Sequence, residues 1–234
     1  EKRNALSLAV MREVTDALES FPEETHAVVV AADGPAFSAG HDLAEMLDRD
    51  ARFYDELFDA CTVMMDAIHR IPAPVIARVH GPAFAAGCQL VAACDLAVAA
   101  ESATFSTPGV KIGLFCSTPM VPVSRAVGRK RAMEMLLTGE PIAARTAAEW
   151  GLVNRVVPDG DLDAAVDELV SKITASSRLV TGIGKRAFYD QVDLDEQGAY
   201  ELTRSVMASN AGLDDAQEGM GAFVGKRTPE WTNT

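Results

Sequence analysis

Positive charge is scarce in this sequence. The 234 residues contain 21 Lys and Arg against 34 Asp and Glu, which gives a formal net charge of −13. A protein that follows a nucleic-acid backbone needs a basic face, so this balance argues against a nucleic-acid partner. A small anionic ligand remains compatible with it, because a helix N-terminus and a few cationic side chains bind such a group locally.

Paired cysteines and long apolar runs are also missing. The four cysteines, at positions 61, 88, 94 and 116, form no CxxC pair, and no histidine lies close enough to complete a zinc site. We therefore expect free thiols and no bound metal. The longest apolar stretch, around residues 83–100, is interrupted by Gly87, Gln89 and Asp95, so no run approaches the ~18–20 residues of a membrane span. With no secretory signal visible, these absences predict a cytoplasmic protein without a membrane segment.

The sequence begins at Glu1 rather than at an initiator Met. We expect that an N-terminal strand is missing from it.

The two parts of the chain differ in their hydrophobic pattern. Over residues 1–158, short β-branched runs alternate with helical segments, a spacing that predicts βαβ units and a largely parallel sheet. Residues 159–234 carry helical patterns alone. The expected strands are 27–32, 74–79, 95–99 and 153–157. The expected helices are 43–69 (with a break near Asp50), 86–93, 118–127, 129–137, 162–175, 178–191, 197–209 and 214–225.

Two loops, at residues 34–43 and 81–90, each follow a predicted strand and precede a predicted helix. Both are rich in glycine and alanine, which let a ligand approach the backbone closely. N–H groups at a helix start lack intrahelical acceptors, so two such loops side by side would direct two donors at one oxygen, as an oxyanion hole does. The same pattern also fits two tight turns without a ligand. Neither loop matches a dinucleotide or Walker A fingerprint, which argues against a nucleotide.

Segments over nearly the whole chain resemble the crotonase (enoyl-CoA hydratase/isomerase) superfamily. The two loops carry its signature segments, AFSAGHDL at 36–43 and GPAFAAGCQL at 81–90, followed by CD at 94–95. Further matches are NALS at 4–7, RAVG at 125–128, LTGE at 137–140, AEWGLV at 148–153 and EGMGAF at 218–223. The resemblance is closest to the enoyl-CoA hydratase domain-containing protein 3 group, through SAGHDL at 38–43, PGV at 108–110 and GLFCSTP at 113–119.

The resemblance implies an α/β fold with a crotonase-type ββα spiral core at 1–158 and a helical trimerisation region at 159–234. It implies an acyl-CoA or enoyl-CoA ligand, with coenzyme A as part of the substrate and no separate cofactor, and a homotrimer or hexamer. The oxyanion donors would be the backbone N–H groups of His41 and Ala86. Because the donors are backbone groups, His41 need not act through its imidazole, although an ordinary pKa near ~6.5 leaves a general-base role open.

The glutamate pair with which hydratases of this superfamily activate water is absent. One proton must leave the water and another must reach the α-carbon, so this hydration needs both carboxylates. The matching positions are Gln89, which takes no proton, and Gly109, which has no side chain. Some members carry an aspartate several residues later, and that position is Cys116. A helix start within 118–127 would lower the pKa of this thiol and activate it; the alternative is a small buried side chain beside the acyl pocket.

The resemblance also implies contacts with the rest of the ligand. Lys2 and Arg3 would lie at the adenine end of CoA, which Phe223 and Lys226 would reach from a neighbouring subunit. The alternatives for these residues are ordinary solvated charges and a core aromatic ring.

Around the two donors, the implied substrate-binding residues are Ala39, Gly40, Asp42 and Gly87. Asp42 also fits the N-cap of the helix that follows it. Ala44 stands where many relatives have a lysine, so we expect fewer phosphate contacts.

The sequence therefore predicts an enoyl-CoA hydratase-like enzyme of fatty-acyl-CoA metabolism that stabilises a thioester enolate. Two alternatives remain open: another thioester reaction such as double-bond isomerisation or hydrolysis, and a non-catalytic acyl-CoA-binding protein.

Overall fold

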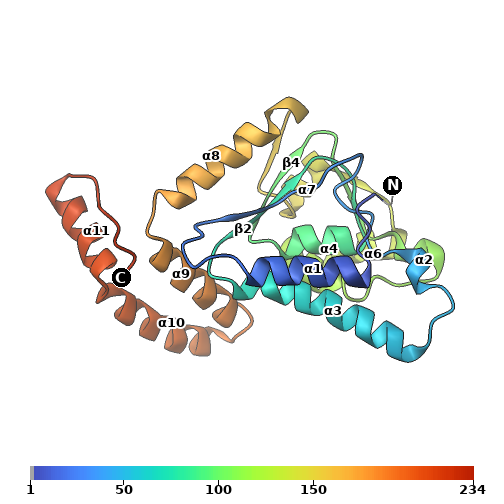
Figure 1. The fold of residues 1–234 in the computed structure, drawn as a ribbon, viewed down its shortest axis with the longest axis horizontal. Helices are drawn as coiled ribbons and strands as arrows, with labels where there is room; N and C mark the ends of the chain where they lie inside the picture. The colour runs from blue at the N-terminus through green and yellow to red at the C-terminus, as the bar shows by residue number, and fades with distance from the viewer. Residues whose placement is uncertain (1–2) are drawn as a thin grey trace.

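A computed structural model of the protein describes residues 3–234 (Figure 1). The first helix in it packs along one side of the molecule. This helix, α1 (Leu8–Glu19), starts at Ser7, whose hydroxyl accepts a hydrogen bond from the Val10 N–H. It packs against the long helix α3 (Ala51–Arg70). Met11 of α1 and Leu57 of α3 are both fully buried. The N-terminal segment is thereby held against the core.

The larger sheet has four parallel strands in the order β1-β2-β4-β7. They are β1 (Val28–Val30), β2 (Val75–Val79), β4 (Leu96–Ala100) and β7 (Arg155–Val157). Helix α3 connects β1 to β2, and α4 (Ala86–Ala93) lies between β2 and β4. The predicted βαβ organisation is confirmed.

A second sheet joins β3 (Ala83–Phe84), β5 (Thr104–Ser106) and β6 (Ile142–Ala143). Strands β3 and β5 are parallel, whereas β5 and β6 are antiparallel. The sequence pattern does not predict these strands. Each has only two or three residues, too few for a local alternation of polar and apolar side chains.

The remaining helical elements complete the core and the C-terminal region. The predicted break near Asp50 is confirmed, because Asp50 accepts a hydrogen bond from the Phe53 N–H at the start of α3. The remaining helical elements within the core are α2 (Leu43–Met46), η1 (Pro108–Ile112), α5 (Met120–Val127), α6 (Arg129–Thr138), α7 (Ala144–Trp150) and η2 (Asp159–Asp161). The C-terminal helices are α8 (Leu162–Thr174), α9 (Arg178–Gln191), α10 (Glu196–Ala211) and α11 (Asp214–Gly225).

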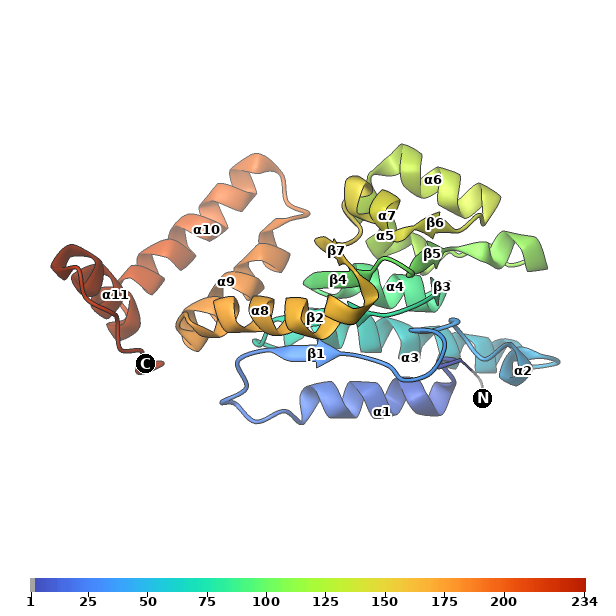
Figure 2. The same cartoon turned by 90° about the horizontal axis from the view of Figure 1, so that it is seen from above.

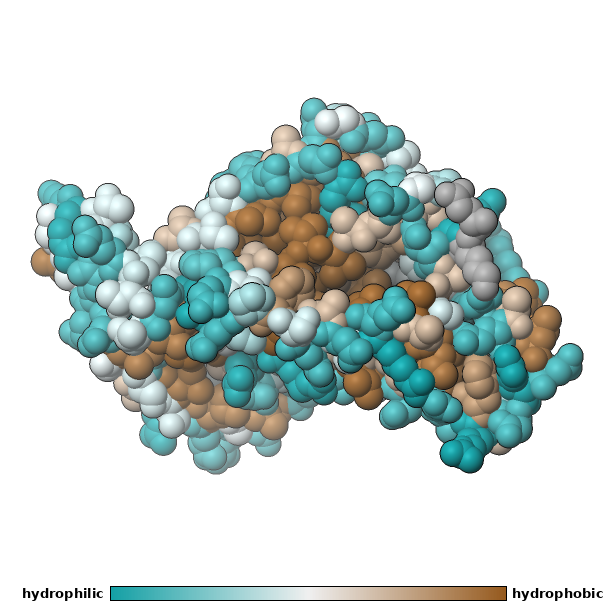
Figure 3. Space-filling model, in the orientation of Figure 1, coloured by the Kyte–Doolittle hydropathy of each residue, from teal (hydrophilic) through white to brown (hydrophobic). Residues whose placement is uncertain are grey.

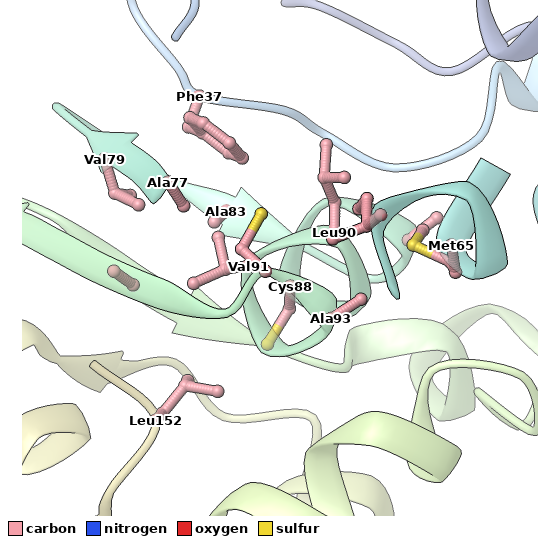
Figure 4. Close-up of a cluster of buried hydrophobic side chains, with 14 of the residues drawn as sticks. Phe37, Met65, Ala77, Val79, Ala83, Cys88, Leu90, Val91, Ala93 and Leu152 are labelled. Atoms are coloured by element: carbon pink, nitrogen blue, oxygen red, sulfur yellow. The ribbon is translucent and has the colours of Figure 1, made fainter. Parts of the chain in front are cut away.

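Helix α4 lies in the middle of the core. Seven of its eight residues are buried. Figure 4 shows Val91 of this helix in one cluster with Phe37 of the first loop and Val79 of β2. Burial on all sides fixes the position of α4, and with it the position of the second glycine-bearing loop at its N-terminus.

The last three helices form an arm that extends from the body (Figures 1 and 2). A mostly buried ion pair anchors its first helix, since the Lys185 ammonium of α9 lies 2.7 Å from the Asp95 carboxylate. The same ammonium donates to the carbonyls of Ile68 and Ala73, and the Tyr189 hydroxyl donates to Asp95 at 2.7 Å. The predicted helical C-terminal region is confirmed.

Apolar side chains also gather in a hollow between α8 and α1, over the strands of the larger sheet (Figure 3). Strand β1 is at the edge of that sheet, and its Val29 is 40% exposed. Within the described part of the chain, no helix has the length and apolar character needed to cross a membrane.

Candidate active site

The two glycine-bearing loops lie in direct contact at Gly40. This residue has a φ of +89°, which glycine adopts without strain. A Cβ atom on Gly40 would lie 2.8 Å from the Cβ of Ala85 and 3.2 Å from the backbone nitrogen of Ala86. Any side chain at position 40 would therefore press on the start of α4.

Hydrogen bonds along the loops hold this contact. Ser38 pairs with Ala83 as an isolated parallel bridge, and the Phe84 N–H donates to the Ser38 carbonyl at 2.9 Å. Gly87 allows a second close approach, because a Cβ atom there would lie 2.5 Å from the same Ser38 carbonyl oxygen. Two segments far apart in the sequence thus form one rigid unit.

The first candidate donor, the N–H of His41, is oriented by the N-terminal segment. Leu6 pairs with His41 as a parallel bridge: the Leu6 N–H donates to the Gly40 carbonyl at 2.8 Å, and the Leu6 carbonyl accepts from the Asp42 N–H at 3.4 Å. In such a pair, consecutive N–H groups point to opposite sides. The N–H of His41 therefore points away from Leu6.

The second candidate donor is the N–H of Ala86, the first residue of α4. The preceding residue, Ala85, has a φ of +50°, a conformation that non-glycine residues adopt rarely and that costs about 1–3 kcal/mol. The N–H groups of a helix's first turn have no intrahelical acceptor. Among the hydrogen bonds of residues 3–234, neither the His41 N–H nor the Ala86 N–H has an acceptor. Two free donors beside Gly40 are suited to a developing oxyanion.

Gln89 lies one helical turn beyond Ala86. It is 4% exposed, and its side-chain carbonyl accepts a long hydrogen bond from the Cys61 thiol at 3.7 Å. Sequence reasoning missed this partner, because Cys61 lies 28 residues earlier on α3 and no local pattern connects the two.

Gly109 and Cys116 lie close together in the folded chain. A Cβ atom on Gly109 would lie 2.8 Å from the Cys116 sulfur and in severe overlap with the Leu114 carbonyl oxygen. The Leu114 N–H donates to the Gly109 carbonyl at 2.9 Å, which closes the loop over this position. The space that a glutamate side chain would need at position 109 is filled by backbone.

The Cys116 thiol is buried, and burial raises its pKa, although a hydrogen bond from the Gly109 backbone opposes the shift. Helix α5 begins at Met120, four residues after Cys116 and two after the predicted start. Of the two alternatives for Cys116, an activated thiol and a small buried side chain, the raised pKa favours the second. Burial thus favours the neutral thiol over the thiolate.

The four residues implied to line the site take different positions. Ala39 is exposed, whereas Gly87 is buried against Ser38. Asp42 is the N-cap of α2, and its carboxylate accepts from the Ala44 N–H at 3.1 Å, which confirms the predicted cap. Gly40 forms the contact described above.

The residues implied to bind the far end of CoA are not brought together in one chain. Lys2 lies outside the described residues, and Arg3 is exposed near the N-terminus. Phe223, which is 86% exposed, and Lys226 lie at the end of α11. Figures 1 and 2 show α11 and the N-terminus at opposite ends of the molecule. Within residues 3–234, no group of three or more His, Cys, Asp or Glu side chains could hold a metal ion.

Known proteins resemble this chain over its full length. The family model described as enoyl-CoA hydratase/isomerase matches residues 1–234. A Mus musculus protein named enoyl-CoA hydratase domain-containing protein 3, mitochondrial, is 47% identical over 235 residues, which cover 99% of this chain and 78% of that protein. The resemblance to that group is confirmed.

Solved structures share the fold. The crystal structure of an enoyl-CoA hydratase from Mycobacterium smegmatis superposes with a TM-score of 0.97 at 51% identity, covering 98% of this chain and 91% of the other. The human enoyl-CoA hydratase domain-containing protein 3 gives a TM-score of 0.95 at 46% identity, with 98% and 92% covered. These matches confirm the expected crotonase-type α/β fold.

The expected cytoplasmic localisation is wrong. The relatives from mouse, rat and human are all named mitochondrial proteins. The absence of paired cysteines does not distinguish the cytoplasm from other compartments that keep thiols reduced, so the cysteine pattern could not decide the localisation.

Proposed function

Since the chain belongs to the enoyl-CoA hydratase/isomerase family, we propose that it binds an acyl-CoA thioester with the carbonyl oxygen between the N–H groups of His41 and Ala86. The observation that carries this proposal is the contact of Gly40 with the start of α4, which leaves two backbone donors side by side. Donors placed in this way stabilise the charge that develops on the oxygen when an enolate forms. Each contributes about 3 kcal/mol to that stabilisation.

The proposed chemistry is not hydration by a glutamate pair. Gln89 is an amide, Gly109 has no side chain and no room for one, and burial raises the pKa of the Cys116 thiol. The alternatives are an isomerisation or hydrolysis of the thioester that uses the same oxyanion hole, and acyl-CoA binding without turnover.

We also propose a homotrimer or hexamer, with the arm of one subunit against its neighbour. Helix α10 has no buried residue, and its Tyr200 and Met207 are 69% and 68% exposed. On α11, Phe223 is 86% exposed. Apolar side chains of this size usually lie in a protein interior or interface. In such an assembly, Phe223 and Lys226 of a neighbouring subunit would reach the CoA site that one chain leaves incomplete.

Two glycine variants test the oxyanion hole. Gly40→Ala and Gly34→Ala both place a side chain at a φ near +90°, since the two angles are +89° and +88°. Only the Cβ at position 40 meets another residue, because nothing lies within 4 Å of a Cβ at position 34. Calorimetric titration with butyryl-CoA should therefore show a weaker affinity for Gly40→Ala alone.

Equal affinities for the two variants would contradict the proposed site. A turnover assay distinguishes an enzyme from a protein that only binds acyl-CoA. The wild type would be assayed with a panel of saturated and unsaturated acyl-CoAs, and hydration, isomerisation and release of free CoA would be monitored.

A further inference from the structure

The imidazole of His41 makes a hydrogen bond of its own to Leu6. Its Nδ1 lies 3.3 Å from the Leu6 carbonyl oxygen. A carbonyl oxygen only accepts hydrogen bonds, so Nδ1 carries the hydrogen. The side chain is thereby assigned to the tautomer in which Nε2 carries no hydrogen.

The other side of the ring is apolar and closed. Nε2 is buried and has no hydrogen-bond partner among residues 3–234. The ring meets Phe58 of α3 edge to face, with a centroid distance of 5.5 Å and an interplanar angle of 78°. Glu45 of α2 interacts electrostatically with the ring, and its carboxylate accepts a hydrogen bond from the Leu8 N–H at 3.0 Å. Nε2 is therefore shielded from solvent and is not placed to exchange a proton with a ligand.

Leu6 thus binds three consecutive residues of the first loop. Its N–H donates to the carbonyl of Gly40, and its carbonyl accepts from the N–H of Asp42. The ring of His41 is the third attachment, and it donates to the same carbonyl as Asp42. Only the backbone N–H of His41 is left for a ligand.

We infer that the His41 side chain is a positioning residue for the first oxyanion donor. The hydrogen bond from its Nδ1–H to the Leu6 carbonyl holds residue 41 in place, so that the backbone N–H of His41 points at the thioester oxygen. This inference rests on the proposed function. It assigns the imidazole to a positioning role and not to general-base catalysis, because Nε2 is buried and has no hydrogen-bond partner among residues 3–234.

Two variants separate the hydrogen bond from the ring. The His41→Asn variant places an amide N–H near the position of Nδ1, so it keeps the donor and loses the ring contact with Phe58. His41→Phe keeps a ring of similar shape and loses the donor. His80→Phe is the matched control, because His80 also binds a loop carbonyl through one nitrogen (Nε2 to Gly34, 2.8 Å) and buries the other without a partner.

The readout is the infrared carbonyl stretch of bound butyryl-CoA labelled with ¹³C at the thioester carbon. Hydrogen bonds to the oxygen lower this frequency. We expect a lowered frequency in the wild type and in His41→Asn. His41→Phe should lose most of the shift and about 3–10-fold in affinity, the effect of one hydrogen bond. His80→Phe should keep both the frequency and the affinity.

An unchanged shift in His41→Phe overturns the inference, and so does an equal loss in His41→Asn. Thermal melts of the same samples report folding, and if His41→Phe does not fold, His41→Leu replaces it with the same expected loss. A wild type that leaves the carbonyl frequency unchanged overturns the proposed function, and this inference with it.

Discussion

The sulfur of Cys116 lies 2.8 Å from the point that a Cβ atom would occupy on Gly109, and the Leu114 carbonyl lies closer still. The absence of a glutamate at position 109 is therefore not a simple truncation. The loop from Leu114 to Cys116 occupies the space, so restoring a glutamate there requires the backbone to move.

Gly109→Ala should destabilise the protein by overpacking, by about 1–3 kcal/mol. The matched control is Gly160→Ala, because a Cβ atom on Gly160 meets nothing within 4 Å. Urea unfolding of both variants measures the difference. Equal midpoints would mean that the loop yields easily, and Gly109→Glu combined with Gln89→Glu would then be a reasonable route to a hydratase, since that reaction needs both carboxylates.

The four thiols should be unreactive in the folded protein. All four are buried, and burial raises their pKa values, to about 12 for Cys61 and Cys88. Titration with a disulfide reagent at neutral pH should detect no fast-reacting thiol before unfolding and all four afterwards. A fast-reacting Cys116 would show that a thiolate is available beside Gly109 and would support a catalytic role for it.

The ion pair between Lys185 and Asp95 should contribute strongly to stability. Both side chains are mostly buried, with 6% and 13% of their surface exposed. Lys185→Met leaves the Asp95 carboxylate without its cation and should cost about 3–5 kcal/mol. The control is Lys172→Met, which breaks an exposed pair with Glu168 on α8 and should cost less than about 1 kcal/mol. Comparable losses in urea unfolding would show that the arm is not anchored by this pair.

Local patterns predict much of the fold and less of the site. The expected helices at 178–191 and 214–225 coincide with α9 and α11, because their apolar periodicity is local. Strand β3 is not predictable in this way, since Ala83–Phe84 becomes a strand only by pairing with Phe105–Ser106. The same limit applies to the site. The two loops are visible in the sequence, whereas the closure of the Leu114 carbonyl over Gly109 depends on the path of the folded backbone.

The protein should lose stability as the pH falls below the usual histidine range. Burial lowers the pKa values of His41 and His69, against the opposing hydrogen bonds to Leu6 and Ala93. Between these lowered values and about 6.5, the unfolded chain binds more protons than the folded chain, so stability rises with pH in that window. The free energy of unfolding in urea should be smaller at about pH 5.5 than at about pH 7.

Replacement of both histidines tests the assignment of this pH dependence. His41→Asn combined with His69→Asn should flatten it, because the replaced groups no longer titrate. A slope that persists unchanged in the double variant would assign the effect to other groups.

The central claim is that two backbone donors bind the thioester oxygen, and a crystal structure with butyryl-CoA bound tests it most directly. We predict that the carbonyl oxygen lies about 3 Å from the backbone nitrogens of both His41 and Ala86. A complex in which the thioester lies away from these two nitrogens, or contacts only one of them, would contradict the account.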